Sequence, residues 1–434
     1  MAWNLGNTSV RNPWRIQGGL RVFANEFSGN LDSSVQEHRF RDALLAADVI
    51  ESGESDAESA RWHGRKWRSC FCKLGFITAK KYRDVGGGRA SNPAIAREVD
   101  LGLSGVAYEI TPAGKNLFDA DTAPAIADVF LRQLVRLEVS SPLEKDATEM
   151  RLKPFILVLQ VLRELRNRNA KGLDQVEIAA FLQTATSHDD YLERVNNVLT
   201  FREQRNSQPG TRRKRISEIQ VVAQQRALSV ARMPKAASLL DYADTTSRYS
   251  RITGLVALRQ NRLTLVEEKY PIVEAILANE PVFLSDTNSI AYLSRFYGGL
   301  LLSTESAATS LHSISDLEVR LRHRGITPVV DVADLREQSP EELTAARHRI
   351  ENQYILLRED DFAKKHFEDN SEIENVLLLL RALNGDRSAA IVIEDKPAFL
   401  EWSVWRAMLI FDHLGVHPSR LLKKSPWDAV FDLP

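Results

Sequence analysis

The sequence predicts a mainly helical α+β fold in which small β-hairpins stand between helices. Apolar residues recur at helical spacing through most of the 434 residues, whereas only a few short stretches alternate with a period of two. Gly75 and the pair Thr111-Pro112 stand where one pattern changes into the other, at positions typical of helix ends and helix starts. A chain of this length predicts roughly two to four domains.

The first predicted hairpin lies between the helix of ESARWHGRKWRSCFCK and the helix that follows Thr111. Gly75 occupies the C-cap position of the first helix, and the stretches FIT and VAYEI have the pattern of strands. Thr111 is an N-cap candidate with Pro112 at the first helical position, and a glycine triplet at 86–88 lies between the strands. Helix, strand, strand, helix is the order of a winged-helix unit, with the first helix as candidate recognition helix.

A second unit repeats this order further along the chain. SLLDYADTTSRYSRITG predicts a helix that ends near Gly254, and residues 255–258 and 263–266 predict two strands joined by the turn RQNR. A helix from about Pro271 closes the unit. Two such units indicate a tandem winged-helix module. Hairpins between helices also occur as scaffolds, and the pattern alone leaves both interpretations open.

Strong helix signals separate the two units. KPFILVLQVLRELR predicts a helix that starts at Pro154, and Asp174 with Glu177 predicts a capping box in the segment GLDQVEIAAFL. Beyond residue 284 the pattern changes to charged amphipathic helices, one of which has its start signal at Ser339-Pro340. This last region predicts a helical linker domain.

Basic residues are concentrated although the net charge is only -1. Residues 61–97 contain ten Lys or Arg and a single acidic residue, Asp84. A basic stripe on a helix and its wing is typical of phosphate contacts. The predicted DNA-binding residues of this first unit are Arg61, Arg65, Lys66, Arg68, Lys73, Lys80 and Lys81.

A second basic run, GTRRKR, follows a polar loop between the two units. Such a run is either a solvated tether or a set of phosphate contacts, and its place in a chain of near-zero net charge favours phosphate. The helix of the second unit adds arginines whose side chains suit guanine in a major groove. The predicted DNA-binding residues here are Arg212, Arg213, Lys214, Arg215, Arg248 and Arg251.

The two cysteines, Cys70 and Cys72, have no partners at zinc-finger spacing and no further cysteine with which to form a disulfide framework. We interpret them as reduced, partly buried thiols. The N-terminus has no secretory signal, and the longest apolar runs fall short of the roughly 18 residues of a membrane span. The sequence therefore predicts a soluble cytoplasmic protein without membrane partners.

Motifs of other enzyme classes are missing from the sequence. There is no phosphate-binding GxxxxGK[ST] loop and no GxGxxG motif, and His413 and His417 lack the glutamate of an HExxH site. The apolar segment KPAFLEWSVWRAMLIF contains Glu401. A buried carboxylate is costly unless it is paired or binds a metal, but an acid near a helix start can also face water.

Several blocks in register resemble the AlwI family of type IIS restriction endonucleases, which includes the BstNBI nicking relatives. The similarity runs from about Asn12 to the end of the chain. The blocks are NPWRIQGGLRVFANEFSG, VFLRQLVRLEVSSP, KPFILVLQVLRELRNRNAKGLDQVEIAAFLQTAT, LDYADTTSRYSRITGLVALRQNRLTL and FLEWSVWRAMLIF.

The resemblance implies winged-helix-like DNA-recognition subdomains at 1–150 and 151–283, a helical linker domain at 284–390, and the start of a PD-(D/E)xK nuclease domain at 391–434. It implies binding of a short non-palindromic site in double-stranded DNA and cleavage or nicking outside it. Mg²⁺ is the implied cofactor, because phosphodiester hydrolysis needs a metal-activated water and a neutralised leaving oxygen. Glu401 matches the family's helix glutamate and is the implied catalytic and metal-binding residue.

The sequence departs from the family's pattern at one place. The family's Pro-Asp and acidic strand motif follow the helix glutamate, whereas this chain stops at Pro434 after LLKKSPWDAVFDLP. We expect the chain to end before the catalytic core. The alternatives are a DNA-binding specificity subunit or regulator, whose partner would be a second nuclease subunit or a transient dimer, and a helical protein-binding scaffold.

Overall fold

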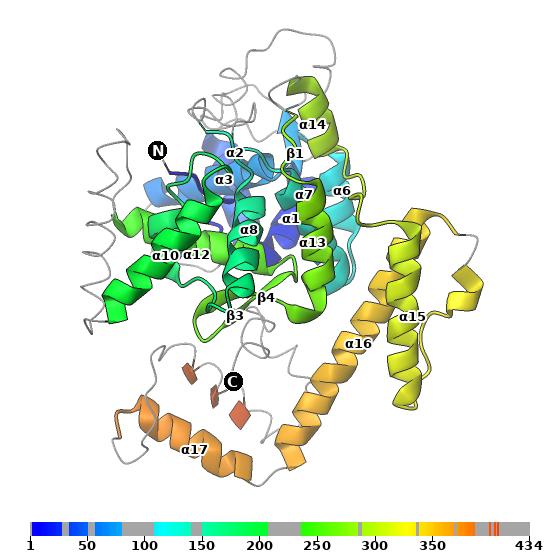
Figure 1. Ribbon diagram of the computed structural model, residues 1–434. Coiled ribbons are helices and arrows are strands. Elements are labelled where there is room, and N and C mark those ends of the chain that lie inside the picture. The colour runs from blue at the N-terminus through cyan, green and yellow to red at the C-terminus, as the bar shows by residue number, and fades with distance from the viewer. Residues whose placement is uncertain are drawn as a thin grey trace. The chain divides into compact units, whose positions relative to one another are not determined.

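The computed structural model describes residues 2–27, 34–50, 57–79, 108–139, 150–206, 236–284, 289–335, 338–368 and 371–386, with six more residues between 399 and 407. This part of the chain is mainly helical, with two small antiparallel hairpins, which confirms the predicted α+β class (Figure 1). The chain divides into two compact units, residues 1–304 and 305–434. Within the described residues, no helix combines the length and apolar character that crossing a bilayer requires.

The first hairpin follows the predicted order. Gly75 has a φ of +73°, which a glycine adopts at low cost, and it separates the preceding helix from the strand. Ile77 pairs with Ile110 in an antiparallel register, and the Thr111 hydroxyl accepts a hydrogen bond from the Gly114 N–H to cap the next helix. The elements are η1 (Pro13–Arg15), α1 (Ile16–Phe27), α2 (Ser34–Ala46), α3 (Ala57–Lys73), β1 (Ile77–Ala79), β2 (Tyr108–Ile110), α6 (Pro112–Asp119) and α7 (Ala123–Arg136).

The second hairpin is joined by a two-residue turn. Gln260 and Asn261 both have positive φ, 51° and 57°, as a tight turn that matches the twist of its strands requires. The capping box of Asp174 and Glu177 is present as predicted. The elements are α8 (Pro154–Asn167), α9 (Gln175–Glu177), the π-helical turn η3 (Ile178–Leu182), α10 (Tyr191–Asn206), α12 (Ala236–Arg251), β3 (Val256–Arg259), β4 (Arg262–Leu265), η4 (Glu267–Lys269), α13 (Tyr270–Asn279) and α14 (Ser289–Tyr297).

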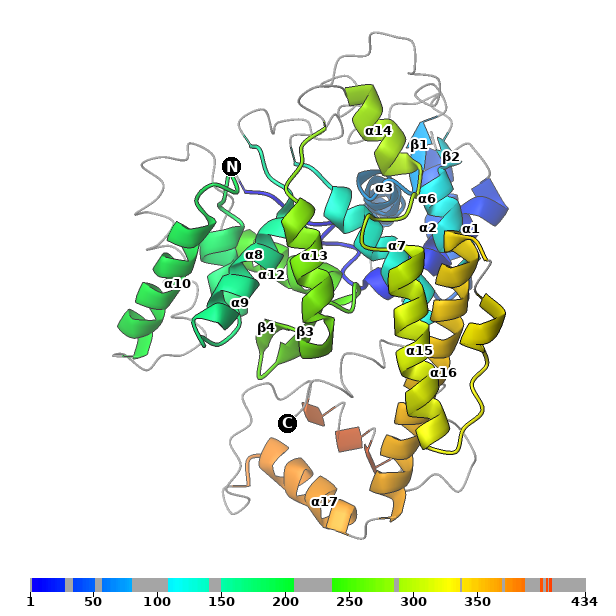
Figure 2. The ribbon, with the colours of Figure 1, turned by 45° about the vertical axis from the view of Figure 1, so that its right-hand side comes forward.

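Both hairpins belong to one hydrophobic core. Helix α8 lies between α10 and α13 in both views and is buried from Pro154 to Leu162 (Figures 1 and 2). Among the described residues, one cluster of buried side chains has members from Trp3 to Leu302. The division of residues 1–304 at 150/151 and 283/284 into subdomains stays a prediction.

The compact unit of residues 305–434 is built on a helical hairpin. Helices α15 (Ala307–His323) and α16 (Pro340–Glu368) pack side by side around a small core of their own, which includes Ile314 and Ile350 (Figure 2). Ser339 and Glu342 form the predicted start of α16, since each accepts a hydrogen bond from the other's backbone N–H. The unit also contains η5 (Val332–Leu335) and α17 (Ser371–Leu383).

Candidate nucleic-acid interface

Helix α12, which precedes the second hairpin, has one polar, partly exposed face. Asp241, Asp244, Arg248 and Arg251 recur at intervals of three or four residues, and we call them the α12 stripe. The Arg248 guanidinium lies 3.0 Å from the Asp244 carboxylate, and these side chains are 41% and 25% exposed. The opposite face is buried at Leu239, Ala243 and Tyr249. The stripe therefore presents hydrogen-bond donors and acceptors outside the core.

The N-terminal segment lies between this helix and α3. The Arg11 guanidinium donates to Asp241 Oδ1 at 3.0 Å, and the Lys66 ammonium of α3 donates to the Ser9 hydroxyl at 2.9 Å. The segment thus joins the α12 stripe to the exposed side of α3. Arg11 and Asp241 are about half exposed, at 52% and 49% of their side-chain surface.

The same segment is anchored from inside. The Tyr249 hydroxyl donates to the Val10 carbonyl at 2.9 Å and lies 3.2 Å from the Cys70 sulfur of α3. Burial raises the pKa of the Cys70 thiol to about 12 and also raises the pKa of Tyr249. Gly6 has a φ of +76°, and a Cβ there would lie 2.5 Å from the Tyr249 ring. The two helices and the segment therefore pack as one body.

Helix α3 differs from the predicted recognition helix over its second half. Every side chain from Trp67 to Cys72 is buried, whereas Arg65, Lys66 and Lys73 are partly exposed. Side chains of the helix from Trp62 to Lys73 are predicted to reach base edges, but those from Trp67 to Cys72 are buried in this conformation and cannot do so. Among the described side chains of α3 beyond Gly64, those of Arg65, Lys66 and Lys73 remain partly exposed.

Arg68 has a structural role in place of the predicted phosphate contact. Its side chain is 1% exposed and pairs with Glu37 of α2 at 3.0 Å. A second nitrogen donates to the Tyr108 hydroxyl of β2 at 3.1 Å. The guanidinium therefore ties α2 and the first hairpin to α3. An exposed phosphate would have to displace a buried carboxylate to reach it.

Other predicted site residues lie outside the described residues. They are Lys80, Lys81, Arg212, Arg213, Lys214, Arg215 and Glu401. Arg61 lies in α3, but its side chain is not among those that the structure describes. Among the described residues, no group of three His, Cys, Asp or Glu side chains could hold a metal ion. The described part of the chain therefore offers no donor set that fits Mg²⁺, and the role of Glu401 stays a prediction.

A buried carboxylate joins three elements in a way that the sequence did not reveal. Glu177, with no exposed surface, pairs with Arg202 of α10 at 2.8 Å and with Arg262 of β4 at 3.0 Å. Arg202 belongs to the basic segment that leads to GTRRKR. Because Arg202 neutralises Glu177, it stabilises the fold and is not part of the exposed basic surface.

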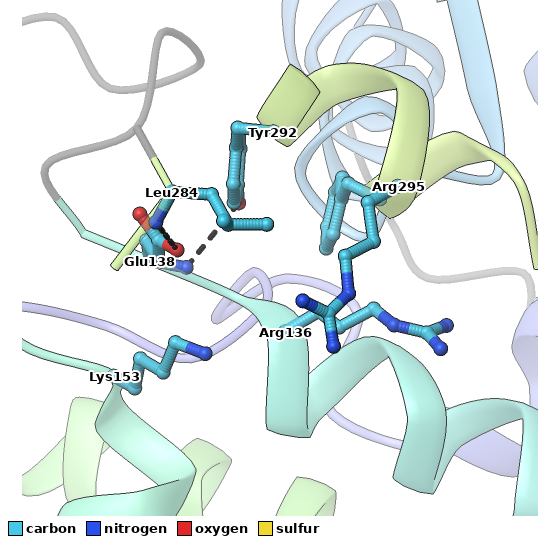
Figure 3. A pocket seen from close by; sticks show the side chains of 7 residues that line it. Arg136, Glu138, Lys153, Leu284, Tyr292 and Arg295 are labelled. Carbon is cyan, nitrogen blue, oxygen red and sulfur yellow. Dashed lines mark hydrogen bonds between the residues drawn. The ribbon is translucent and has the colours of Figure 1, made fainter. Parts of the chain in front are cut away.

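A small pocket lies where α7, α8 and α14 meet (Figure 3). Glu138 accepts a hydrogen bond from the Leu284 N–H at 3.0 Å, and its own N–H donates to the Tyr292 hydroxyl at 3.3 Å. The Lys153 ammonium is 2.6 Å from Glu280 Oε2, and burial lowers the pKa of Lys153 although Glu280 opposes this shift. Polar groups of the pocket thus hold the ends of helices together. The lining residues are Arg136, Glu138, Lys153, Leu284, Tyr292, Arg295 and Phe296.

His188 supports the start of α8 from the side. Its Nε2 accepts a hydrogen bond from the Lys153 N–H at 2.7 Å, and its Nδ1 lies 2.8 Å from Gln160 Oε1. Because an acceptor nitrogen carries no proton, the neutral ring has its proton on Nδ1 and donates it to Gln160. Burial, followed by the nearby Lys153 charge, lowers the pKa of His188 to about 4.

Comparison with known families gives one match. The family model described as AlwI restriction endonuclease matches residues 72–422, which is most of the chain. The matched range includes both hairpins, α12 and nearly all of the compact unit 305–434, whereas Arg11 and most of α3 precede it. A search of curated proteins found no match.

Proposed function

Because the chain belongs to the AlwI restriction endonuclease family, we propose that it is a type IIS restriction enzyme. It binds a short non-palindromic site in double-stranded DNA and, with Mg²⁺, cleaves or nicks the DNA outside that site. Members of this family are restriction endonucleases, which cleave DNA. The finer features are proposed from the site described above and from the family resemblance.

The observation that carries the DNA-reading part is the α12 stripe. An α-helix fits the major groove, where arginine donates to guanine and a carboxylate accepts from the cytosine amino group. The stripe offers both chemistries within three turns, and it precedes a hairpin at the position of a wing. We therefore propose that α12 is the recognition helix of a winged-helix-like unit.

Basic residues of α3, of the segment that follows β1 and of the loop at 212–215 are proposed to contact phosphates. Arg65, Lys66 and Lys73 are the described candidates on α3, and Lys80, Lys81 and residues 212–215 are the further candidates. Phosphate contacts position a protein on the duplex and contribute to affinity for all sequences. They complement the base contacts of α12.

Cleavage is proposed from family membership. Glu401 is the proposed metal ligand by resemblance, and no step of the reaction is assigned to the described residues. Mg²⁺ would supply the activated water and neutralise the leaving oxygen. Arg248 and Arg251, by contrast, belong to binding, and their loss should weaken site recognition before any effect on chemistry.

Selection of duplexes from a random library by the full chain tests the recognition step. With EDTA present, we expect one short non-palindromic sequence to be enriched. A plasmid with that sequence should then be cut or nicked at a fixed offset when Mg²⁺ is added. Glu401→Gln should abolish cleavage and leave binding unchanged. Site-specific binding without cleavage by the wild-type chain would favour the specificity subunit, and no enrichment would contradict the proposal.

Salt dependence tests the proposed phosphate contacts of the loop at 212–215. Replacing Arg212, Arg213, Lys214 and Arg215 with alanine should weaken binding to all sequences and flatten the plot of log K against log salt. Each lost contact reduces the slope by about 0.9. A matched variant with lysine at positions 212, 213 and 215 keeps the charge and should keep the slope. An unchanged slope in the alanine variant would refute this assignment.

A further inference from the structure

We propose that Arg11 is a specificity-determining residue that reads the edge of a G·C base pair next to the bases contacted by α12. The inference rests on the proposed function, since it requires that α12 faces duplex DNA. It adds to the interface a residue that precedes the family match and that lies outside both helix–hairpin units.

The guanidinium of Arg11 is held in place while half of its surface stays exposed. Its Nε donates to the Thr8 carbonyl at 3.0 Å, and one Nη donates to Asp241 Oδ1 at 3.0 Å. A guanidinium has five N–H groups. Two are used by these contacts, so two on Nη1 and one on Nη2 can form a forked pair of hydrogen bonds. A preorganised fork loses less side-chain freedom on binding.

The backbone on both sides of Arg11 is also fixed. Val10 is 2% exposed, and its carbonyl accepts the Tyr249 hydroxyl. The Ser9 N–H donates to Asn7 Oδ1 at 2.9 Å, and Asn12 caps the next helical turn by accepting from the Trp14 N–H at 3.1 Å. Arg11 is therefore presented by a structured segment whose anchor is α12 itself.

The neighbouring carboxylate favours a base edge over a phosphate. Asp241 lies 3.0 Å from the guanidinium, and its negative charge repels an approaching phosphate more strongly than it repels a neutral acceptor, which carries only a partial charge. In the major groove, guanine offers the acceptors N7 and O6, and its partner cytosine offers an amino donor. Arg11 and Asp241 present the complementary order of donors followed by an acceptor. The pair therefore matches a G·C edge.

The test compares full-length variants with EDTA present, on the sequence that the wild-type chain selects. Each base pair is substituted singly, and each guanine is also replaced by 7-deazaguanine, which lacks the N7 acceptor. For the wild-type chain we expect substitution of one G·C pair to weaken binding roughly 5- to 150-fold. In Arg11→Gln and Arg11→Ala this loss should shrink to within about twofold, whereas discrimination at the other positions persists.

Two further variants make the test specific. Asp241→Ala removes the partner that orients Arg11 and should reduce discrimination at the same base pair. Arg21→Gln is the matched control, because Arg21 is also exposed and held by carbonyls, those of Phe118 and Ala120, but on α1. The control should leave the whole specificity profile unchanged.

The outcomes separate this inference from the proposed function. Retained discrimination in both Arg11 variants overturns the inference. Equal weakening on all sequences with a smaller salt slope also overturns it, because that pattern marks a phosphate contact. If the wild-type chain selects no sequence, the proposed function fails and the inference fails with it. A normal wild-type profile with an unaltered Arg11 profile contradicts the inference alone.

Discussion

Acidification should destabilise the compact unit of residues 1–304 through His188. The neutral ring accepts the Lys153 N–H and donates to Gln160, so protonation would place an N–H opposite another N–H. Burial and the Lys153 charge lower the pKa of His188 from 6.5 to about 4. Between these values the unfolded chain binds more protons than the folded chain. The stabilisation contributed by the neutral His188 ring is therefore fully present above pH 6.5 and is lost as the pH falls toward 4.

The size of this effect follows from the two pKa values. A difference of about 2.5 between 6.5 and about 4, at 1.36 kcal/mol for each pH unit, gives about 3 kcal/mol of unfolding free energy. That is a large part of the roughly 5 to 15 kcal/mol by which a domain is stable.

Urea unfolding at a series of pH values between 4 and 7, followed by tryptophan fluorescence, measures the effect. In His188→Gln the side chain no longer titrates, so the unfolding free energy should depend less on pH over this range. His312→Gln is the control, since that side chain is 80% exposed and should leave the wild-type dependence intact. Identical pH profiles for the wild type and His188→Gln would refute the reasoning.

Three further predictions follow from buried contacts. Glu177→Gln leaves Arg202 without its buried counter-charge and leaves Arg262 with Asp174 alone as counter-charge, and we expect the unfolding free energy to fall by roughly 3 kcal/mol in urea titration. The exposed Glu267→Gln should lower the unfolding free energy far less than Glu177→Gln does, and equal losses in the two variants would contradict the burial argument. Gly6→Ala should lower the melting temperature more than Gly325→Ala, because both have positive φ but only the first places its Cβ against a ring. Comparable shifts would show that the contact with Tyr249 is not restrictive. Cys70 and Cys72 are buried and the pKa of Cys70 is raised to about 12, so an aromatic disulfide reagent should label neither thiol before urea unfolds the protein; rapid labelling of the native chain would argue against this packing.

Local signals in the sequence predicted the hairpin units well. Gly75, Thr111-Pro112 and the turn at Gln260-Asn261 each restrict the backbone by their own chemistry, so the strands and helix starts fall within about two residues of their predicted places. The capping box at Asp174 and Glu177 was equally predictable, because both partners lie within one helical turn.

Long-range contacts were not predictable in the same way. Arg68 occurs in a basic run, and nothing in that run indicates that Glu37, on another helix, will bury and neutralise it. The second partner of Glu177, Arg262, is 85 residues away in the chain. Helical spacing in α3 suggested one apolar face, whereas surrounding elements bury every side chain from Trp67 to Cys72. A charge count gives the local concentration of cations but not their burial.

One part of the candidate interface could be predicted from the sequence. The helix from Asp241 to Arg251 was proposed to read bases, and its exposed stripe keeps that proposal open. The role proposed for Arg11 could not be predicted from the sequence, because it depends on contacts with Thr8 and Asp241, the second of which is 230 residues away. Only the folded chain brings these groups together.

The hydroxyl of Tyr249 has a consequence for how new specificities could arise. It bridges α12 to the sulfur of Cys70 in α3 and to the Val10 carbonyl, while the ring packs on Phe130 at 6.5 Å between centroids. Transplanting one helix–hairpin unit from a relative would sever this junction and leave buried polar atoms on both sides of the graft. New sequence preferences in this protein should therefore come from single exposed positions, such as those of the α12 stripe, and exchange of whole subdomains should give insoluble or unfolded chimeras.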